Sequence, residues 1–336
     1  MRKVSSGSKI ADRIFKVATG ISASSPVLFL AAIAVIVLLQ AMPSIVFMGW
    51  HFLYGINWDM GNLYGATEVK HGVTAPAGAS YGALPFIVGT LASSVIALVI
   101  GVPISIFTAL ILAYKVRGTL RMILSILVEL LAGIPSVIFG LWGIVVLAPW
   151  VGHKFAPLLT HLGAVLPMFK GPVGTGLGLL TSGIVLALMI VPIITATTRD
   201  LLEQVPILYR EGGVGLGMTS WEVVRFICLP YIKEGLVGAV ALGWGRAMGE
   251  TMAVLMVSGS AINYLPHNIY SPISTMAAVI ADQLDSAMTD ATHMAVHALA
   301  ELALVLMVLT LVTNLVARWL VNRGRTGRGI GAGVKV

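Results

Sequence analysis

Six long runs of apolar residues, separated by shorter polar segments, dominate the chain. They cover about residues 26–48, 86–114, 122–150, 177–197, 236–259 and 298–320. Each run can cross the hydrocarbon core of a bilayer, which takes about 20 helical residues. Pro135 and Pro192 stand inside the third and fourth runs, but neighbouring helices can satisfy the backbone groups that a proline frees in a membrane. The pattern predicts an all-α membrane protein with six transmembrane helices.

The composition agrees with a membrane protein and excludes several other classes. Only 10% of the 336 residues are charged and 57% are hydrophobic, whereas soluble domains carry about 25% charged residues. The net charge of +7 does not indicate nucleic-acid binding, because the basic residues are scattered between apolar runs rather than gathered with aromatic ones. Cys228 is the single cysteine, so no intrachain disulfide and no paired-cysteine metal or redox site is expected.

Lysine and arginine are distributed unevenly between the two sides that six spans would create. Seventeen of the 21 lie in the N-terminal segment, in 115–121, in 198–235 and in the C-terminal tail, three lie in the opposite segments, and the last is Arg246. Cytoplasmic segments carry the excess of basic residues, so both termini are predicted to be cytoplasmic. The first run is long for a signal peptide and no small-residue cleavage site follows it, so we interpret it as an uncleaved helix.

These features predict a division of the chain into four parts. The parts are a basic cytoplasmic N-terminus at 1–25, a first transmembrane helix with its external loop at 26–85, a transmembrane core at 86–320 and a flexible cytoplasmic tail at 321–336. The tail is rich in glycine and arginine, and we expect it to lie near anionic lipid headgroups. The chain is thus expected to be a multi-pass protein of the plasma membrane.

The longest cytoplasmic loop, at 198–235, has helical character. Its stretch "REGGVGLGMTSWEVVRFICLP" predicts a helix, a turn and a second helix. Gly215 and Gly217 can end the first helix, because glycine readily adopts the left-handed conformation there. Thr219, with Glu222 three residues later, predicts a capping box at the start of the second helix. Pro230 is expected to end that helix.

The same loop carries a signature of fixed spacing. Five positions across twenty residues match the EAA loop of ABC import permeases, in which E-A-A is followed by G and then by I-x-L-P; they are Glu211, Gly217, Ile227, Leu229 and Pro230. Gly212 and Gly213 stand where that family has its two alanines, and glycine disfavours a helix by about 1 kcal/mol relative to alanine. The alternative interpretation is an ordinary amphipathic loop on the membrane surface.

Further segments extend the resemblance to most of the chain. They are "GTLASSVIALVIGVPISIFTAL", "ELLAGIPSVIFGLWG", "MIVPIITATTRDLLEQVP" and "GRAMGETMAVLMVSG". From about residue 26 to 320 the chain resembles the permease subunits of phosphate-specific ABC importers. The basic N-terminus and the Gly/Arg-rich tail lie outside this resemblance.

The resemblance implies a type I ABC importer permease fold with cytoplasmic EAA coupling helices, in a bacterial plasma membrane. It implies inorganic phosphate as the substrate, and three kinds of partner: a second permease subunit, a dimer of cytoplasmic ATPase subunits and an extracytoplasmic phosphate-binding protein. No lysine of the chain stands in G-x-x-x-x-G-K-[ST], so no nucleotide-binding loop is expected. The chain is therefore predicted to be a transport subunit rather than an enzyme, without a cofactor or metal of its own, while the ATPase partner binds ATP and magnesium.

Other functions remain as alternatives. Within the same class, the chain could be the sister permease of the phosphate importer, or a permease for sulfate, molybdate or phosphonate. An ATP-independent transporter or channel would leave the EAA spacing unexplained. A membrane enzyme would need a paired aspartate, a Ser/His dyad or a metal triad at membrane depth, and the sequence offers none.

Charged residues inside the apolar runs are the candidates for the substrate path, because charge at membrane depth is expensive and by default indicates function. Arg246 and Glu250 are four residues apart, so on one helix they share a face. They are either an ion pair that only fixes packing or part of an anion path, in which the guanidinium offers a fork of donors to phosphate and Glu250 limits how tightly the anion is held. Thr251 could add a hydroxyl to this path.

The remaining polar residues in or near the spans are weaker candidates. Glu129 is expected to pair with a basic group on another helix or on the sister subunit, either as part of the path or as a structural contact. Glu301 lies near the outer start of the last span, where water can reach it. His293 and His297 have a spacing that zinc ligands use, but no third ligand is evident, so a solvated or capping role is favoured over a metal site.

Overall fold

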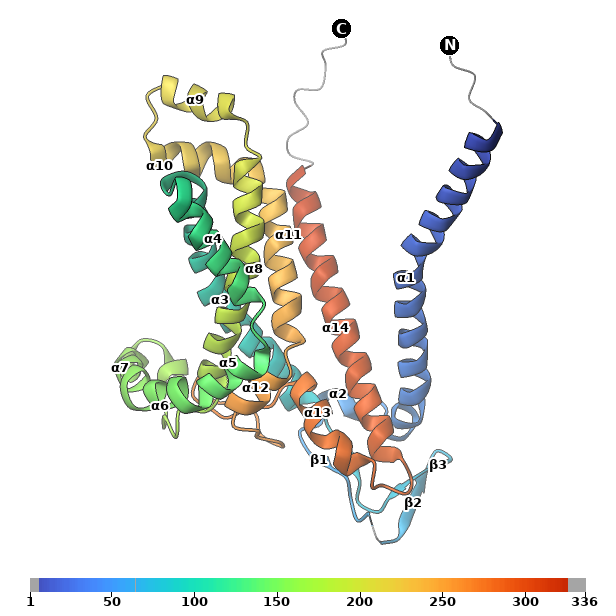
Figure 1. Cartoon of the computed structure of the whole chain (residues 1–336). Coiled ribbons are helices and arrows are strands. Elements are labelled where there is room, and N and C mark those ends of the chain that lie inside the picture. Colours follow the sequence, from blue (N-terminus) through green and yellow to red (C-terminus); the bar gives the residue numbers. More distant parts are fainter. Residues whose placement is uncertain (1–5, 64, 326–336) are drawn as a thin grey trace.

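The computed structural model describes residues 6–63 and 65–325, and it is mostly helical. Six helices are long and apolar enough, by length and composition, to cross a membrane among the described residues. Five of these spans belong to α1 (Ser6–Met48), α3 (Leu84–Leu110), α8 (Leu179–Glu203), α11 (Leu229–Met248) and α14 (Met294–Arg325), and the third span is the continuous helical stretch Ser136–Thr160. Helix α4 (Gly118–Ala132), with 15 residues, is shorter than these spans. The five long helices stand roughly alongside one another in Figure 1 and give the molecule its height. The expectation of a helical membrane protein with six candidate spans is confirmed.

The shorter elements lie at the two ends of the bundle. The short α-helices are α2 (His51–Tyr54), α5 (Ser136–Trp142), α6 (Ala148–Trp150), α7 (Ala156–Thr160), α9 (Ile207–Gly215), α10 (Ser220–Val223), α12 (Met252–Val257) and α13 (Met276–Ala287). π-helical segments are η1 (Ile111–Lys115), η2 (Gly143–Leu147), η3 (Val151–Phe155) and η6 (Val224–Cys228), and 3₁₀ segments are η4 (His161–Ala164) and η5 (Pro167–Phe169). In Figure 1, α9 and α10 lie at the end of the bundle opposite α13 and the strands.

Helix α8 forms the centre of the bundle. It packs against α3, α4 and α11, and 72% of its most apolar 18-residue stretch is buried inside the protein. Gly243 of α11 allows a close approach to α8, since a Cβ at this position would lie 2.7 Å from the Cδ1 atom of Ile194. Pro192 lies within α8 without ending the helix, as the sequence predicted.

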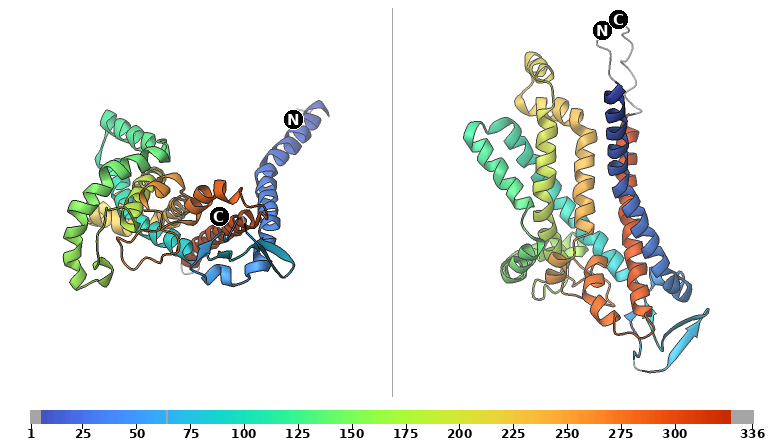
Figure 2. Two further views of the ribbon diagram at one scale, coloured as in Figure 1. Left: turned by 90° about the horizontal axis from the view of Figure 1, so that it is seen from below. Right: turned by 45° about the vertical axis from the view of Figure 1, so that its right-hand side comes forward.

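Helix α1 diverges from the rest of the bundle. It packs along α14, but the two helices separate toward the end that holds α9 and α10, as Figure 1 and the left view of Figure 2 show. The helix begins at Ser6 and runs without interruption to Met48, so the predicted N-terminal segment at 1–25 is helical from Ser6 and continuous with the first span. Its apolar side chains from residue 14 to 39 are largely exposed on this chain, so they must face lipid or another subunit.

Two predicted spans are interrupted in the structure. The run 122–150 divides at residues 133–135 into α4 and α5, and α5, α6 and α7 then turn across the bundle in Figure 1. The run 236–259 divides at residues 249–251 into α11 and α12. The first interruption follows from Pro135, which cannot donate a helical hydrogen bond and disfavours helical geometry in the residue before it.

The external segment folds into a small unit with its own core. Strand β1 (Trp58–Asp59) pairs with β4 (Ser80–Tyr81), and β2 (Thr67–Lys70) pairs with β3 (Val73–Pro76), both antiparallel. The aromatic ring of Trp58 lies 5.2 Å from that of Tyr81 and 5.4 Å from that of Phe86, between ring centroids. These four short strands are an addition to the predicted all-α architecture.

The predicted tail needs a correction. Helix α14 continues to Arg325, so residues 321–325 belong to a helix rather than to a flexible segment; residues 326–336 lie outside the described residues. The N-terminal end of α1 and the C-terminal end of α14 lie at the same end of the bundle as α9 and α10 (Figures 1 and 2). This placement agrees with an even number of spans, while the side of the membrane stays a prediction.

Candidate functional site

Arg246 lies in the last turn of α11, at the end of that helix away from α9 and α10. Seventeen residues separate it from Leu229 at the helix start, a rise of about 25 Å. Its side chain is exposed on this chain, and within the described residues it has no ion pair. The guanidinium is therefore a positive charge that nothing within the described part of this chain neutralises.

Glu250 does not share a helix face with Arg246, so this part of the sequence-based interpretation is wrong. Helix α11 ends at Met248, and the chain leaves helical geometry at Gly249. The Glu250 carboxylate instead accepts a 3.4 Å hydrogen bond from the backbone N–H of Ala253, in the first turn of α12. A negative charge at the N-terminus of a helix is favourable, which explains why the acid turns toward α12 and leaves the arginine open.

The neighbouring residues have separate roles around this break. Thr251 donates a 3.4 Å hydrogen bond from its hydroxyl to the Gly249 carbonyl. Gly245, one residue before Arg246, has open space where a Cβ would stand. The three glycines of this stretch therefore differ in role. Gly243 packs closely on a neighbouring helix, Gly245 leaves open space and Gly249 follows the end of α11.

The two interrupted helices meet each other. Helix α5 packs on α12, and a Cβ at Gly140 of α5 would lie 2.7 Å from the Sδ atom of Met256. Broken helices in transporters expose backbone groups and helix ends to a substrate near the middle of the membrane. The break that holds Glu250 and the break at Pro135 are therefore mechanically connected through α5 and α12.

Glu129 belongs to a different cluster, between α4 and α8. Its carboxylate lies 3.1 Å from the Nη2 atom of Arg199, whose guanidinium also contacts Asp200 at 2.8 Å and Glu203 at 3.9 Å. Arg121, near the start of α4, pairs with Glu203. The expected pairing of Glu129 with a basic group on another helix is confirmed, and the structure does not bring Glu129 together with Arg246.

The residues that complete this cluster were not predicted as a site. They are Arg199, Asp200 and Glu203, and the four-residue spacing of Arg199 and Glu203 is the signal that could have indicated a shared helix face. The Arg199 side chain is only 13% exposed, and α4 contributes no buried residue of its own. The cluster is thus a main polar contact that holds α4 against the centre of the bundle.

The loop 198–235 has the helix–turn–helix form that the sequence predicted. The Thr219 hydroxyl accepts a 3.3 Å hydrogen bond from the Glu222 N–H, and the Glu222 carboxylate accepts one of 2.7 Å from the Thr219 N–H. Both halves of the capping box are present. Gly217 has a φ of +80°, the left-handed region in which glycine is favoured at a helix end.

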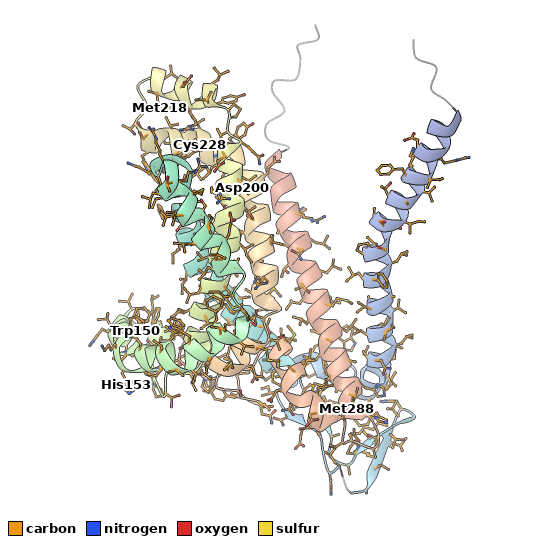
Figure 3. The ribbon with its side chains drawn as sticks, in the orientation of Figure 1. Trp150, His153, Asp200, Met218, Cys228 and Met288 are labelled. Carbon is orange, nitrogen blue, oxygen red and sulfur yellow. The ribbon has the colours of Figure 1, made fainter. Side chains whose placement is uncertain are left out.

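The two glycines that replace alanine are not equivalent. Gly213 is buried, and a Cβ there would lie 2.6 Å from the Cδ1 atom of Ile227, so two positions of the EAA signature contact each other across the turn. Gly212 has open space where a Cβ would stand, and Glu211 is exposed. In Figure 3, Met218 and Cys228 mark the same end of the molecule, far from Trp150 and His153.

Pro230 does not end the second helix, contrary to the sequence-based expectation. The helical path runs from α10 through η6 into α11, which begins at Leu229 and carries Pro230 in its first turn. The π-helical segment η6 precedes the proline and changes the hydrogen-bond register, so the helical path continues although Pro230 has no N–H to donate. The coupling loop therefore joins α11, and hence Arg246, without a flexible joint.

His297 and Glu301 each connect α14 to α1. The Nδ1 atom of His297 lies 2.7 Å from the Gln40 carbonyl of α1, and the Ser44 hydroxyl donates a 2.5 Å hydrogen bond to the buried Glu301 carboxylate. The expectation that water reaches Glu301 is therefore wrong, because α1 covers this side chain. Within the described residues, no group of three His, Cys, Asp or Glu side chains could hold a metal ion.

Comparisons with known proteins agree with one another on the family. The sequence model of the family "Binding-protein-dependent transport system inner membrane component" matches residues 101–326. The chain is 50% identical over 319 residues, 94% of each chain, to "Phosphate transport system permease protein PstC 1" of Mycobacterium tuberculosis. It is 38% identical over 298 residues to "Phosphate transport system permease protein PstC" of Pasteurella multocida, covering 88% of this chain and 89% of that one.

Solved structures give a weaker likeness. An inward-facing structure of the MetNI methionine ABC transporter matches 72% of this chain and 94% of its own, with a TM-score of 0.49 and 18% identity. The family match covers most of the chain, and the PstC relatives cover nearly all of it. The chain therefore belongs to the family of binding-protein-dependent transport system inner membrane components.

Proposed function

We propose that this chain is the permease subunit that carries inorganic phosphate inward in a PstC-type ABC importer. The relatives that cover 94% and 88% of the chain bear the name of phosphate transport permeases. The observation that carries the proposal for the site is Arg246, an exposed guanidinium without an ion pair in the described part of the chain, beside a helix break. An arginine fork matches phosphate oxygens with paired hydrogen bonds.

The arrangement at the break sets how the anion is held. Glu250 is directed to the N-terminus of α12, so its negative charge does not cancel Arg246 through a direct pair. It is only four residues from Arg246 along the chain, so we expect its charge to weaken the local positive potential. In this proposal Arg246 attracts the anion, and Glu250 and the Thr251 hydroxyl keep the site from binding it too tightly for release.

The EAA loop supplies the coupling to ATP hydrolysis in this proposal. Glu211, with Gly212 and Gly213, lies on α9, and large apolar side chains around it are unusually exposed: Leu208 is 76% and Leu216 is 82% exposed. Exposed apolar patches of this kind mark interaction surfaces. A dimer of cytoplasmic ATPase subunits, which would bind the ATP and magnesium, would dock there.

Force from that surface would travel along a helical path. Gly217, Ile227, Leu229 and Pro230 connect α9 to α11 through continuous helical segments, so ATP-driven closure of the ATPases would bias the packing of α11 between two states. A second, PstA-like permease would complete the pore beside this chain, and an extracytoplasmic phosphate-binding protein would deliver the anion. Helix α1 and the external segment would be accessory to the core at 86–320.

Reconstitution of the complete importer in liposomes tests the function. Phosphate uptake should depend on this chain, on ATP and on the binding protein, and excess sulfate or molybdate should not compete. Uptake of another oxyanion in preference to phosphate would contradict the substrate. Uptake by this chain without the ATPase subunits would contradict the class.

A further inference from the structure

A groove runs between α11 and α14 on the surface of this chain. Its volume is about 220 Å³, and its lining includes Gly238, Ala241 and Leu242 of α11 and Asn314, Ala317 and Arg318 of α14. The two helices pack side by side, as Figure 1 shows. The groove is lined by the middle of α11 and by the C-terminal half of α14, whereas Arg246 lies in the last turn of α11.

The groove is aligned with Arg246 along one face of α11. Gly238, Leu242 and Arg246 are spaced by four residues each, so they lie in one row on that helix. Leu242 and Arg246 are exposed, while Ala239, Gly243 and Ala247 form the buried face of the helix. Eight residues separate Gly238 from Arg246, a rise of about 12 Å. An open strip of small and apolar side chains therefore connects the arginine to the groove.

The far end of the strip carries a second arginine. Arg318 is exposed, and within the described residues it has no ion pair. Asn314 lies one helical turn before it and adds an amide donor to the same groove. Among the described residues, the lining contains no acidic side chain. The donors of this groove thus suit an oxyanion with several oxygens.

We propose that this groove is the inner half of the anion path and that Arg318, with Asn314, forms a second phosphate-binding station after Arg246. The inference rests on the proposed function and deepens it. Conduction through a membrane requires sites that bind well enough to admit an ion and weakly enough to release it, which several stations in series achieve. A second arginine beyond the apolar strip would give phosphate that leaves Arg246 a favourable site on the far side of that strip.

A phospholipid headgroup presents the same phosphoryl oxygens as free phosphate, so the experiment must separate the two sources. Arg318→Gln is compared with Arg117→Gln, which removes an arginine from the loop before α4, outside the groove. Uptake by complete importers is measured in liposomes of neutral lipid and of lipid rich in phosphatidylglycerol. Arg318→Gln should lower the maximal uptake rate about tenfold in both, the loss of roughly one charge-assisted hydrogen bond, while Arg117→Gln should not.

A chemical probe reports on the groove without relying on transport. Gly238→Cys fits, because a Cβ there meets no atom within 4 Å, and the single native Cys228 is buried. In the assembled importer, an anionic methanethiosulfonate should modify this cysteine about tenfold faster than a cationic one, and inorganic phosphate should slow the reaction. The preference should disappear with Arg318→Gln and remain with Arg117→Gln.

The outcomes are distinguishable. An unreactive Gly238→Cys, or equal rates for the two reagents, would overturn the proposal, because the groove would then be dry or uncharged. A loss of uptake confined to phosphatidylglycerol liposomes would assign Arg318 to lipid binding and overturn it too. Normal uptake by Arg318→Gln alongside loss of uptake by Arg246→Gln would reject the second station only, whereas normal uptake by both variants would reject the proposed site at Arg246.

Discussion

Arg199 and Arg246 lie on neighbouring helices of one bundle but in opposite electrostatic surroundings. Arg199 of α8 is 13% exposed and contacts the carboxylates of Glu129, Asp200 and Glu203. Arg246 of α11 is exposed and has no carboxylate partner within the described residues. The nearest acid along its own chain, Glu250, is directed to a helix N-terminus instead.

The difference indicates two uses of the same side chain. A charge that is partly buried must be paired, because removing it from water is expensive, and Arg199 satisfies this requirement with three acids from two helices. Its role is to hold α4 in place. An unpaired guanidinium at membrane depth gains nothing from the protein itself, so its favourable partner must come from outside the chain. In our proposal that partner is the transported anion.

The largest effect should come from the unpaired arginine. Arg246→Gln removes the fork that would hold the anion, and we expect phosphate uptake in liposomes to fall about 100-fold, since hydrogen bonds to charged groups are worth about 1.5–3 kcal/mol each. Assembly with the partner subunits should be unchanged. Arg199→Gln serves as the comparison, and complexes that assemble with this variant should keep most of their phosphate uptake. Equal losses of uptake in the two variants would contradict the distinction between the two arginines.

A second effect should appear at α9 and at the turn that follows it. Glu211→Ala removes an exposed charge from α9, and Gly217→Ala forces alanine to a φ of +80°, which is strained by about 1 kcal/mol. Both variants should lower uptake about tenfold at an unchanged KM, with ATP hydrolysis no longer stimulated by the binding protein. A changed phosphate KM with normal stimulation would place these residues in the substrate path instead.

The ion pair between Glu129 and Arg199 can be tested by reversing its charges. Glu129→Arg places like charges together and should destabilise the chain by about 1 kcal/mol, a modest value because the Glu129 side chain is 55% exposed and exposed pairs contribute little. Combining it with Arg199→Glu should restore part of that loss. Thermal unfolding of the detergent-solubilised chain measures both. If the loss of stability in the double variant equals the sum of the losses in the two single variants, the ion pair does not contribute to stability.

The smallest effect concerns a buried acid that is held by hydrogen bonds. Asp290 precedes α14 and accepts hydrogen bonds from the N–H groups of Thr292, at 2.8 Å, and Ala295, at 3.0 Å. Burial raises the pKa of this carboxyl, but the hydrogen bonds outweigh burial and leave the pKa below its ordinary value of 3.8. A lowered pKa means that the carboxylate stabilises the fold above the ordinary pKa and that this stabilisation is lost as the pH falls through the lowered one.

Replacing this acid should therefore remove a pH dependence. Asp290→Asn should cost about 1 kcal/mol near neutral pH, the usual value of a helix cap, and should flatten the stability change of the parent chain at acidic pH. The unfolding temperature between pH 3 and 7 measures the slope. Phosphate uptake at neutral pH should stay near that of the parent, whereas uptake by Arg246→Gln should fall. Asp290 thus extends the comparison to a residue that has no place in the anion path.

Patterns that depend on neighbouring residues were predictable. The capping box at Thr219 and Glu222 was found where the spacing placed it, and Pro192 was tolerated inside α8. Errors arose where a local rule was extended too far. The four-residue spacing of Arg246 and Glu250 implied a shared face only while the helix continued, and it ends at Met248. Pro230 likewise ended no helix, because the π-helical segment before it changed the register.

The sequence by itself determined the number of apolar spans, the family resemblance and the form of the coupling loop. These features rest on hydrophobic length, on spacing and on contacts between residues a few positions apart, all of which are written along the chain. The tertiary structure decided which charges are paired. The Arg199 guanidinium meets Glu129 from 70 residues away, and the groove of Arg318 forms only where α14 packs on α11. Such contacts depend on the distances between packed helices, because electrostatic pairing acts through space rather than along the sequence.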